Sequence, residues 1–271
     1  MTEPAAWKVV AHNTATQSQN KIHDDSVARQ FGFRGGLVPG VDDYAYMAHV
    51  PAAAWGLDWL ERGTLDARFH KPVYDGDEVE VRPGPLQRSD DGESFSLELV
   101  DPSGTVCATG TATLPSGSPG LVVGDHDPLV PLPDPPPAAS PQSLAVGTVF
   151  SLPTRPVTAE DQERYRADVR DDLSIYGAEG LAHPGWLLRL ANRILAGNVA
   201  LGPWIHVSSD VRHRALARDG DHIGGRSTVS AQWEHKGHRF VTLDVELVAV
   251  AGTSETVVAS VAHTAIYQPR S

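Results

Sequence analysis

The sequence predicts an α+β fold in which a long helix covers one face of an antiparallel sheet, and it predicts this arrangement twice. Two observations lead to this expectation. A proline-rich stretch divides the 271 residues near their middle, and short motifs recur in the same order on both sides of it. In each half, a segment with helical periodicity precedes segments that alternate apolar and polar residues. This order of elements is typical of α+β domains.

The proline-rich stretch, residues 127–142, reads DPLVPLPDPPPAASPQ and contains seven prolines. Proline fixes φ and donates no backbone hydrogen bond, so this stretch cannot join a helix or a central strand. A semi-rigid spacer between two halves fits this composition, and a long surface loop within one domain is the alternative. We therefore expect an N-terminal domain over residues 1–126 and a C-terminal domain over residues 143–271.

Two motifs occur in both halves. Residues 65–77 (LDARFHKPVYDGD) align with residues 209–221 (SDVRHRALARDGD) at an offset of 144, and Asp, Arg and the final Asp-Gly-Asp recur in place. Upstream, residues 36–40 (GLVPG) align with residues 181–185 (LAHPG) at an offset of 145 on the Pro-Gly pair. Two motifs in the same order at nearly the same spacing indicate an internal duplication.

The elements follow the same order in each half. Residues 41–48 place apolar side chains at i, i+3, i+4 and i+7, which predicts a helix that Pro51 interrupts or ends. Its counterpart, residues 186–195, is apolar on most sides and is expected to be buried. Thr158, followed three residues later by Asp161, fits a helix N-cap of the capping-box type. Strands are expected over residues 77–81, 94–100, 105–112, 239–247 and 256–265.

Composition excludes several classes of protein. The formal net charge of −12 leaves no basic footprint for nucleic acid. No run of about 18 apolar residues could span a membrane, and the N-terminus lacks a basic region followed by an apolar core. A single cysteine, Cys107, cannot form an internal disulfide. Neither GxGxxG nor a P-loop occurs, and the histidines lack metal-site spacing, so we expect a cytoplasmic protein without cofactor or metal.

Several segments resemble the MaoC-like acyl-thioester hydratases and dehydratases, a family with a double hotdog fold. Residues 147–150 and 157–165 resemble the opening strand and short helix of that family. Residues 20–24 (NKIHD) resemble its Asn-Pro-Ile-His segment, and residues 33–40 (FRGGLVPG) resemble its glycine-rich loop and helix start. The resemblance implies a tandem (double) hotdog, with two long central helices against a continuous antiparallel sheet.

The catalytic pair of that family is an Asp and a His five positions later, with an Asn between them. In the N-terminal half Asn20 and His23 match, but Ser18 stands at the Asp position. Serine has no useful basicity without a base beside it, so another carboxylate must supply that function. Asp24 and Asp25 follow directly and are candidates, although carboxylates at the start of a short helix are also favoured as caps.

The resemblance therefore implies named roles. His23 acts as base or acid, Asn20 orients substrate or water, Asp24 supplies the carboxylate, and the Gly40 amide at a helix start binds the developing enolate. The other residues expected against the substrate are Gly36, Val38 and Tyr44.

We expect hydration or dehydration of an enoyl or 3-hydroxyacyl thioester carried by CoA or acyl-carrier protein. Thioester hydrolysis, with Asp24, Asp42 or Asp43 activating water, is the first alternative. A non-catalytic acyl-binding subunit is the second. Arg34 or Lys71 are candidates to bind the phosphates of CoA, and a homodimer of double hotdogs is a further expectation.

The copies have diverged unequally, which predicts where the site lies. At the positions of the family motif, the C-terminal half keeps Asp171 but has Leu173 and Tyr176 in place of Asn and His. Leu and Tyr suit filling space better than transferring protons. We expect one open, mostly apolar crevice beside His23 and Asn20, between the loop of one half and the strands of the other, and a filled counterpart around Tyr176.

Overall fold

The computed structural model describes residues 2–16, 18, 20–117 and 128–270. Its N-terminal half contains β1 (Trp7–Val10), the 3-10 helix η1 (Lys21–His23), α1 (Asp25–Gln30), α2 (Gly40–Trp55), α3 (Leu57–Arg62), β2 (Thr64–Phe69), β3 (Glu78–Pro83), β4 (Gln87–Ser89), β5 (Gly92–Val100) and β6 (Val106–Pro115). Its C-terminal half contains β7 (Val149–Pro156), α4 (Ala159–Val169), α5 (Ser174–Glu179), α6 (Pro184–Asn198), β8 (Ile205–His213), β9 (His222–His235), β10 (His238–Ala251) and β11 (Ser254–Gln268).

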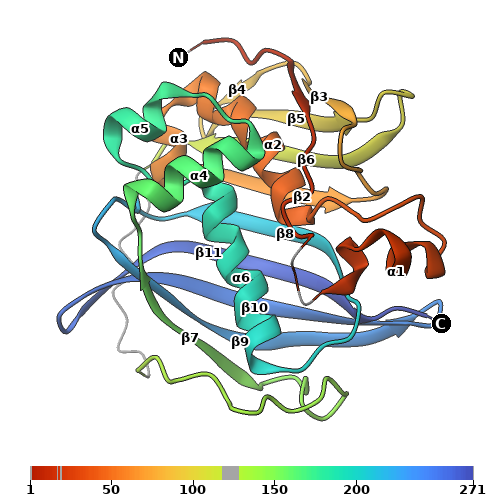
Figure 1. Cartoon of the computed structure of the whole chain (residues 1–271). Helices are drawn as coiled ribbons and strands as arrows, with labels where there is room; N and C mark the ends of the chain where they lie inside the picture. The colour runs from red at the N-terminus through yellow and green to blue at the C-terminus, as the bar shows by residue number, and fades with distance from the viewer. Residues whose placement is uncertain (1, 17, 19, 118–127, 271) are drawn as a thin grey trace.

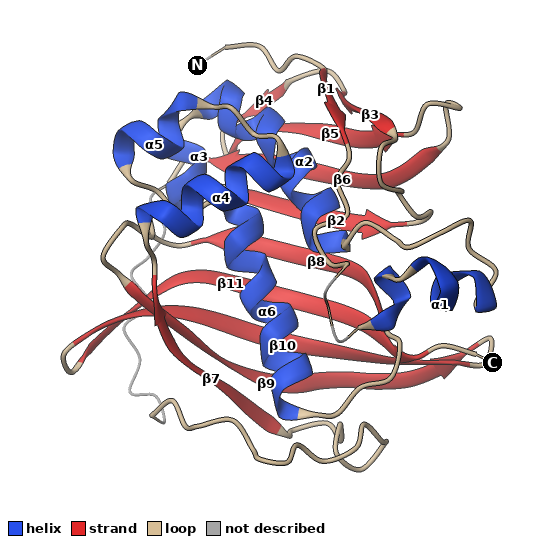
Figure 2. Ribbon diagram, viewed as in Figure 1, coloured by secondary structure: helices blue, strands red, loops and turns tan. Residues whose placement is uncertain are grey.

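The described strands form one antiparallel sheet of 11 strands in the order β1-β3-β5-β6-β2-β8-β11-β10-β9-β7, with β4 paired to β5. The long helices α2 and α6 lie together on one face of this sheet (Figures 1 and 2). The predicted α+β class and the continuous sheet with two long helices are thus confirmed. No helix among the described residues is both long and apolar enough to cross a bilayer.

The two halves meet where β2 pairs with β8. In this pair Asp66 lies opposite Asp210, and these two residues also occupy equivalent positions in the sequence repeat. In an antiparallel pair of two repeated strands, only the residue on the symmetry axis can face its own copy. A pseudo-twofold axis therefore passes between Asp66 and Asp210 and relates the two halves.

The helix α2 is buried on nearly all sides because it lies between the sheet and the helices α4 and α6. Pro51 neither interrupts nor ends it, since α2 continues through Pro51 to Trp55. A proline inside a helix removes one backbone hydrogen bond. Burial of the surrounding side chains offsets that loss, which the local sequence pattern does not reveal. In α4, Thr158 accepts from the Asp161 N–H at 3.1 Å, so the predicted N-cap is confirmed.

The described part of the proline-rich stretch, residues 128–142, packs along the C-terminal half. The Val130 N–H donates to Ser151 Oγ at 2.9 Å, and the Ala139 N–H donates to the Ala200 carbonyl at 3.0 Å. The predicted domain boundary at residues 126 and 127 lies outside the described residues.

A buried carboxylate of the C-terminal half, Asp171, binds His49 of α2 and so joins the two halves. Asp171 accepts from His49 Nδ1 at 3.0 Å and from His183 Nε2 at 3.1 Å. Trp7 stacks on the His49 ring at a centroid distance of 3.8 Å. Burial alone would raise the pKa of Asp171, but the hydrogen bonds from His183 and His49 outweigh burial and hold this pKa below its ordinary value.

We expect Asp171→Asn to lower the free energy of unfolding by about 3 kcal/mol at neutral pH, because it breaks a buried charged network. The folded-state pKa is depressed, so the contribution is complete above the ordinary pKa of 3.8 and is lost as the pH falls below it. Urea denaturation between pH 7 and pH 3 measures both effects. The exposed neighbour provides the control, Asp172→Asn, and equal stability of the two variants would contradict the assignment.

Candidate functional site

A cavity of about 260 Å³ lies between the two halves, and we call it the His23 cavity. The N-terminal half contributes η1 and the start of α2, and the C-terminal half contributes the start of β8 and the end of β11. Its apolar wall consists of Ile22, Phe33, Leu37, Val38, Phe69, Trp204, Ile205, Val207 and Ile266. Its polar side chains are Asn20, His23, Asp43, His70, Lys71, Asn192 and His206.

His23 is oriented by a backbone carbonyl. Its Nδ1 lies 2.7 Å from the Leu37 carbonyl oxygen, which can only accept, so Nδ1 carries the hydrogen. In the neutral ring Nε2 then carries the lone pair, which accepts a long hydrogen bond of 3.4 Å from Asn20 Nδ2. Burial lowers the pKa of His23, and this outweighs the opposing effect of the hydrogen bond to Leu37. His23 is therefore a neutral base at neutral pH.

Asn20 binds the segment that carries His23 to the C-terminal half. Its Nδ2 donates to the Trp204 carbonyl at 2.9 Å, and its Oδ1 accepts from the Trp204 N–H at 3.2 Å. The same Oδ1 caps η1 by accepting from the Ile22 N–H. Asn20 was predicted to orient substrate or water. Both polar atoms of its side chain instead bond mainly to the backbone of the cavity wall.

The glycine-rich loop has two places where only glycine fits. A Cβ at Gly36 would lie 2.1 Å from the His23 carbonyl oxygen, and a Cβ at Gly40 would lie 2.9 Å from His206 Nδ1. Gly40 and Val38 line the His23 cavity, whereas Gly36 lines an adjoining polar cleft that also contains His23 and Asp24. Gly40 is the first residue of α2, where an N–H has no acceptor within the helix.

Besides Gly36, two predicted residues do not line the cavity. Asp24 is the exposed N-cap of α1 and accepts from the Ser26 and Val27 N–H groups at 2.9 and 3.2 Å. Its pKa is lowered, first by the Ser26 hydroxyl and then by these backbone groups. Tyr44 is fully buried inside α2. Capping determines the first placement, and the buried face of α2 determines the second.

The carboxyl group in the His23 cavity belongs to Asp43, which the sequence offered only for the hydrolytic alternative. Asp43 is 4% exposed, and its Oδ1 has no hydrogen-bond partner among the described residues. Burial, followed by repulsion from Asp42, raises the pKa of Asp43 well above its ordinary value. Asp43 is therefore placed to be an acid. Asp42 instead binds Arg189 and accepts from the Thr14 hydroxyl at 2.6 Å.

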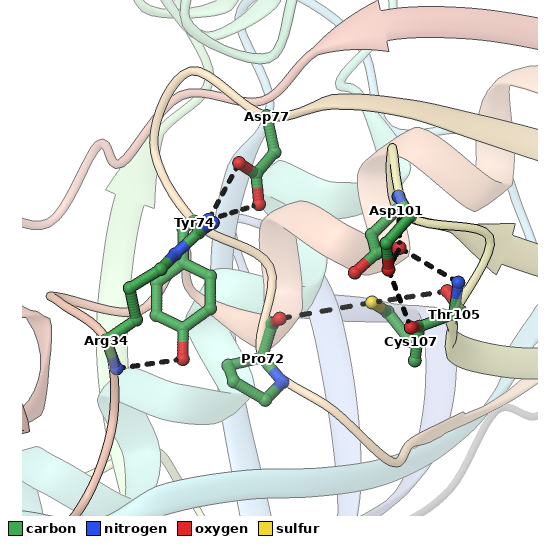
Figure 3. Close-up of polar contacts among 8 residues, drawn as sticks. Arg34, Pro72, Tyr74, Asp77, Asp101, Thr105 and Cys107 are labelled. Atoms are coloured by element: carbon green, nitrogen blue, oxygen red, sulfur yellow. Dashed lines mark hydrogen bonds and ion pairs between the residues drawn. The ribbon is translucent and has the colours of Figure 1, made fainter.

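The two predicted phosphate contacts differ in whether their charge is already paired within the protein. Figure 3 shows Arg34 across the ring of Tyr74, with Asp77 accepting from its guanidinium. Both Asp77 oxygens lie 2.7 Å from Arg34 Nη2, so this cation is already neutralised. Lys71 is exposed at the His23 cavity and has no ion pair with any other residue in the described ranges. Burial raises the pKa of the Cys107 thiol, in the same view, to about 11, so this thiol is protonated at neutral pH.

A second cavity of about 590 Å³ adjoins the first and shares His23, Asn20 and Asn192 with it. Its apolar wall includes Val41, Ala196, Ala200 and Leu201. It is large enough for an acyl chain that passes His23.

The corresponding place in the C-terminal half is filled. Tyr176 is 1% exposed, and its ring packs against His183 at a centroid distance of 4.7 Å. His49, Asp171 and Asp172 lie close enough together to hold a metal ion. However, the oxygens of Asp171 already accept from His49, His183 and the Leu173 N–H, so this cluster is a poor ligand set.

Known structures with this architecture share little sequence with the chain. A protein from Chloroflexus aurantiacus described as a MaoC domain dehydratase aligns over 100% of this chain and 95% of its own, with 14% identity and a TM-score of 0.65. A conserved Mycobacterium tuberculosis protein with a double hotdog fold aligns over 98% and 96%, with 16% identity and a TM-score of 0.62. The chain has the double hotdog fold.

A third structure match carries a different description. A Novosphingobium aromaticivorans protein described as a thioesterase aligns over 86% of this chain and 89% of its own, with 12% identity and a TM-score of 0.52. No protein-family model matches the sequence, and no curated protein matches it. These likenesses therefore bear on the fold of the chain alone.

We expect His23 to titrate below pH 6.5 and to carry its hydrogen on Nδ1 at neutral pH, because burial disfavours the charged ring and Leu37 fixes the tautomer. Long-range ¹H–¹⁵N NMR spectra recorded over a pH series measure both properties, with His23→Gln identifying the resonances. A pKa above 6.5, or a hydrogen on Nε2, would show that the loop does not hold the ring in this way.

Proposed function

We propose that the chain catalyses hydration or dehydration of an acyl thioester of the enoyl or 3-hydroxyacyl type. The observation that carries this proposal is that one mostly apolar cavity contains a neutral imidazole, His23, and a buried carboxyl with a raised pKa, Asp43. Two titratable groups whose environments separate their pKa values in this way suit a paired base and acid. The double hotdog fold, shared with a protein described as a MaoC dehydratase, supports the same chemistry.

Hydration needs a base for water and an acid for the α-carbon. In the proposed step, His23 Nε2 accepts a proton from a water molecule whose oxygen bonds to C3 of the enoyl group. The electrons of the double bond move toward the carbonyl, and the Gly40 N–H at the start of α2 stabilises the negative charge on that oxygen. Asp43 then donates a proton to C2. The proton held by His23 returns to Asp43 through solvent, which restores both groups.

Thioester hydrolysis is the second candidate, and it is favoured by the position of Asp43 and by the shared fold of a protein described as a thioesterase. In that reaction water attacks the carbonyl carbon and the thiol departs with a proton. In the carboxylate mechanism Asp43 would act as the base, but its raised pKa opposes this role near neutral pH. Hydration therefore fits the protonation states better.

One exposed cation at the edge of the cavity could contact the phosphates of the substrate carrier. Lys71 is exposed there and is the only one of the two predicted phosphate contacts that is not neutralised within the described chain. We propose that it faces the phosphates of CoA or of the acyl-carrier prosthetic group, while the acyl chain occupies the second cavity.

We expect His23→Ala and Asp43→Asn each to lower kcat for crotonyl-CoA hydration by about 10²-fold to 10⁴-fold, the range for a general acid or base. The loss of absorbance of the conjugated thioester measures the rate. Asp24→Asn serves as the comparison, because that carboxylate caps α1 outside the cavity and its removal should leave kcat within about threefold.

The competing functions give other results in the same assays. Release of free thiol from saturated acyl-CoA would support hydrolysis. Binding of acyl-CoA without turnover at any chain length would support a non-catalytic subunit and would contradict the proposed reaction.

The pH dependence of kcat/KM should be bell-shaped, because activity needs neutral His23 and protonated Asp43. Activity falls on the acid side as His23 gains a proton, at a pH below 6.5. It falls on the alkaline side as Asp43 loses its proton, at a pH well above 3.8. Asp43→Asn should abolish the alkaline limb of the residual activity, and persistence of that limb would exclude Asp43 as the acid.

A further inference from the structure

Three buried polar side chains of the C-terminal half form a chain that ends at the His23 cavity. His206 Nε2 lies 2.8 Å from Ser209 Oγ, and Ser209 Oγ lies 2.9 Å from His263 Nδ1. His206 is 6% exposed, and Ser209 and His263 are fully buried. None of the three has a role in the steps proposed above.

A break in the strand register brings these side chains to the same face of the sheet. His206 and Ser209 are three residues apart on β8, so in a regular strand they would point to opposite faces. In the pairing of β8 with β11, Ser208 lies opposite Thr264 and His206 opposite Ala265, which leaves Val207 unpaired. This extra residue is a β-bulge, a feature that often re-aims a side chain beside an active site.

The chain leaves an unpaired nitrogen at each end. Neither His206 Nδ1 nor His263 Nε2 has a hydrogen-bond partner within the part of the protein that the structure describes. A buried polar atom without a partner is destabilising, so its presence calls for an explanation. The fold itself does not require it, because the position equivalent to Ser209 in the N-terminal half is the buried Leu65.

The direction of the hydrogen bonds decides which end is a donor. When the single hydroxyl hydrogen of Ser209 bonds to one ring, the other ring must donate to Oγ, so the chain runs in one of two directions and both imidazoles share the same tautomer. In one direction both carry hydrogen on Nδ1, which places the unpaired N–H of His206 at the cavity wall. In the other, an unpaired N–H is sealed in the interior at His263. Buried N–H groups without partners are rarer than unfilled acceptors, which favours the first direction.

His206 Nδ1 lies beside Gly40, the residue whose N–H is proposed to bind the thioester carbonyl. A Cβ added to Gly40 would be 2.9 Å from this nitrogen, so His206 packs directly against the first residue of α2. Both residues line the His23 cavity. Phe69 packs on the His206 ring at a centroid distance of 4.7 Å and restricts its rotation.

We propose that His206 is a second hydrogen-bond donor to the thioester carbonyl, beside the Gly40 N–H, and that Ser209 and His263 are positioning residues that hold it in the Nδ1–H tautomer. This inference rests on the proposed function, since it assumes an acyl thioester in the His23 cavity. The site is then shared, because the N-terminal half supplies His23, Asp43 and Gly40 and the C-terminal half supplies the second donor.

A neutral imidazole suits this role. Burial, followed by repulsion from His263, lowers the pKa of His206 far below its ordinary value, so the ring stays uncharged at neutral pH. A neutral ring stabilises the negative charge on the carbonyl oxygen without giving up its own proton. The transition state would therefore gain a donor that needs no reorganisation during the reaction.

Ligand binding tests the proposal without turnover. Butyryl-CoA and its thioether analogue S-butyl-CoA differ by the carbonyl oxygen. We expect His206→Gln, which keeps an amide near Ser209 but loses the donor beside Gly40, to weaken butyryl-CoA binding roughly tenfold, as for loss of one buried hydrogen bond, and to leave S-butyl-CoA binding unchanged. His206→Asn, whose amide nitrogen matches the position of Nδ1, should restore part of the difference. The exposed His222→Gln is the matched control.

NMR spectra of the unmodified protein test the tautomer independently of any variant. We expect both His206 and His263 to carry hydrogen on Nδ1, and Ser209→Ala to give a mixture of tautomers at His206 together with a lower kcat at unchanged S-butyl-CoA affinity.

The outcomes separate the two proposals. Nε2–H at both rings, or equal losses for both ligands in His206→Gln, would overturn the role of His206 while leaving the proposed function in place. Failure of the wild type to bind either ligand would overturn both.

Discussion

The antiparallel pairing of β2 with β8 is the constraint on which the rest of this structure depends. Backbone hydrogen bonds between these strands fuse two half-sheets into one, and the register that sets Asp66 opposite Asp210 fixes how the halves face each other. The helices α2 and α6 are consequently brought together on one face. The loop of the N-terminal half then lies beside the start of β8, so the His23 cavity exists only because both halves form its walls.

Polar groups are distributed unequally around that pseudo-twofold axis. Where the C-terminal half has Ser209, the N-terminal half has Leu65, and where the N-terminal half has His23, the C-terminal half has the buried Tyr176. The buried hydrogen-bond network at Asp171 joins the two halves on the side where Tyr176 fills the crevice. One end of the interface between the halves is thus packed for stability, and the other keeps an opening lined by groups able to exchange protons.

The architecture could be predicted from the sequence because it depends on periodicity, caps and an internal repeat, all of which are visible in the order of the residues. The repeated Asp-Gly-Asp and Pro-Gly motifs located both halves, and Thr158 marked the start of α4. The site was less predictable. Asp42 and Asp43 are adjacent and identical in type, and only the rotation of α2 decides that one meets Arg189 while the other faces the cavity. His206 depends on a one-residue bulge, which strand alternation does not reveal.

The joining of both halves in one chain removes a restriction that identical subunits cannot escape. In a symmetric dimer of a single hotdog, one gene specifies both crevices, so any substitution that closes one closes the other as well. Here each half has its own codons on either side of the axis between Asp66 and Asp210. Selection could therefore fill one crevice with Tyr176 and equip the other from both sides. The covalent link therefore allowed the two crevices to change independently, although the pseudo-twofold axis still relates their positions.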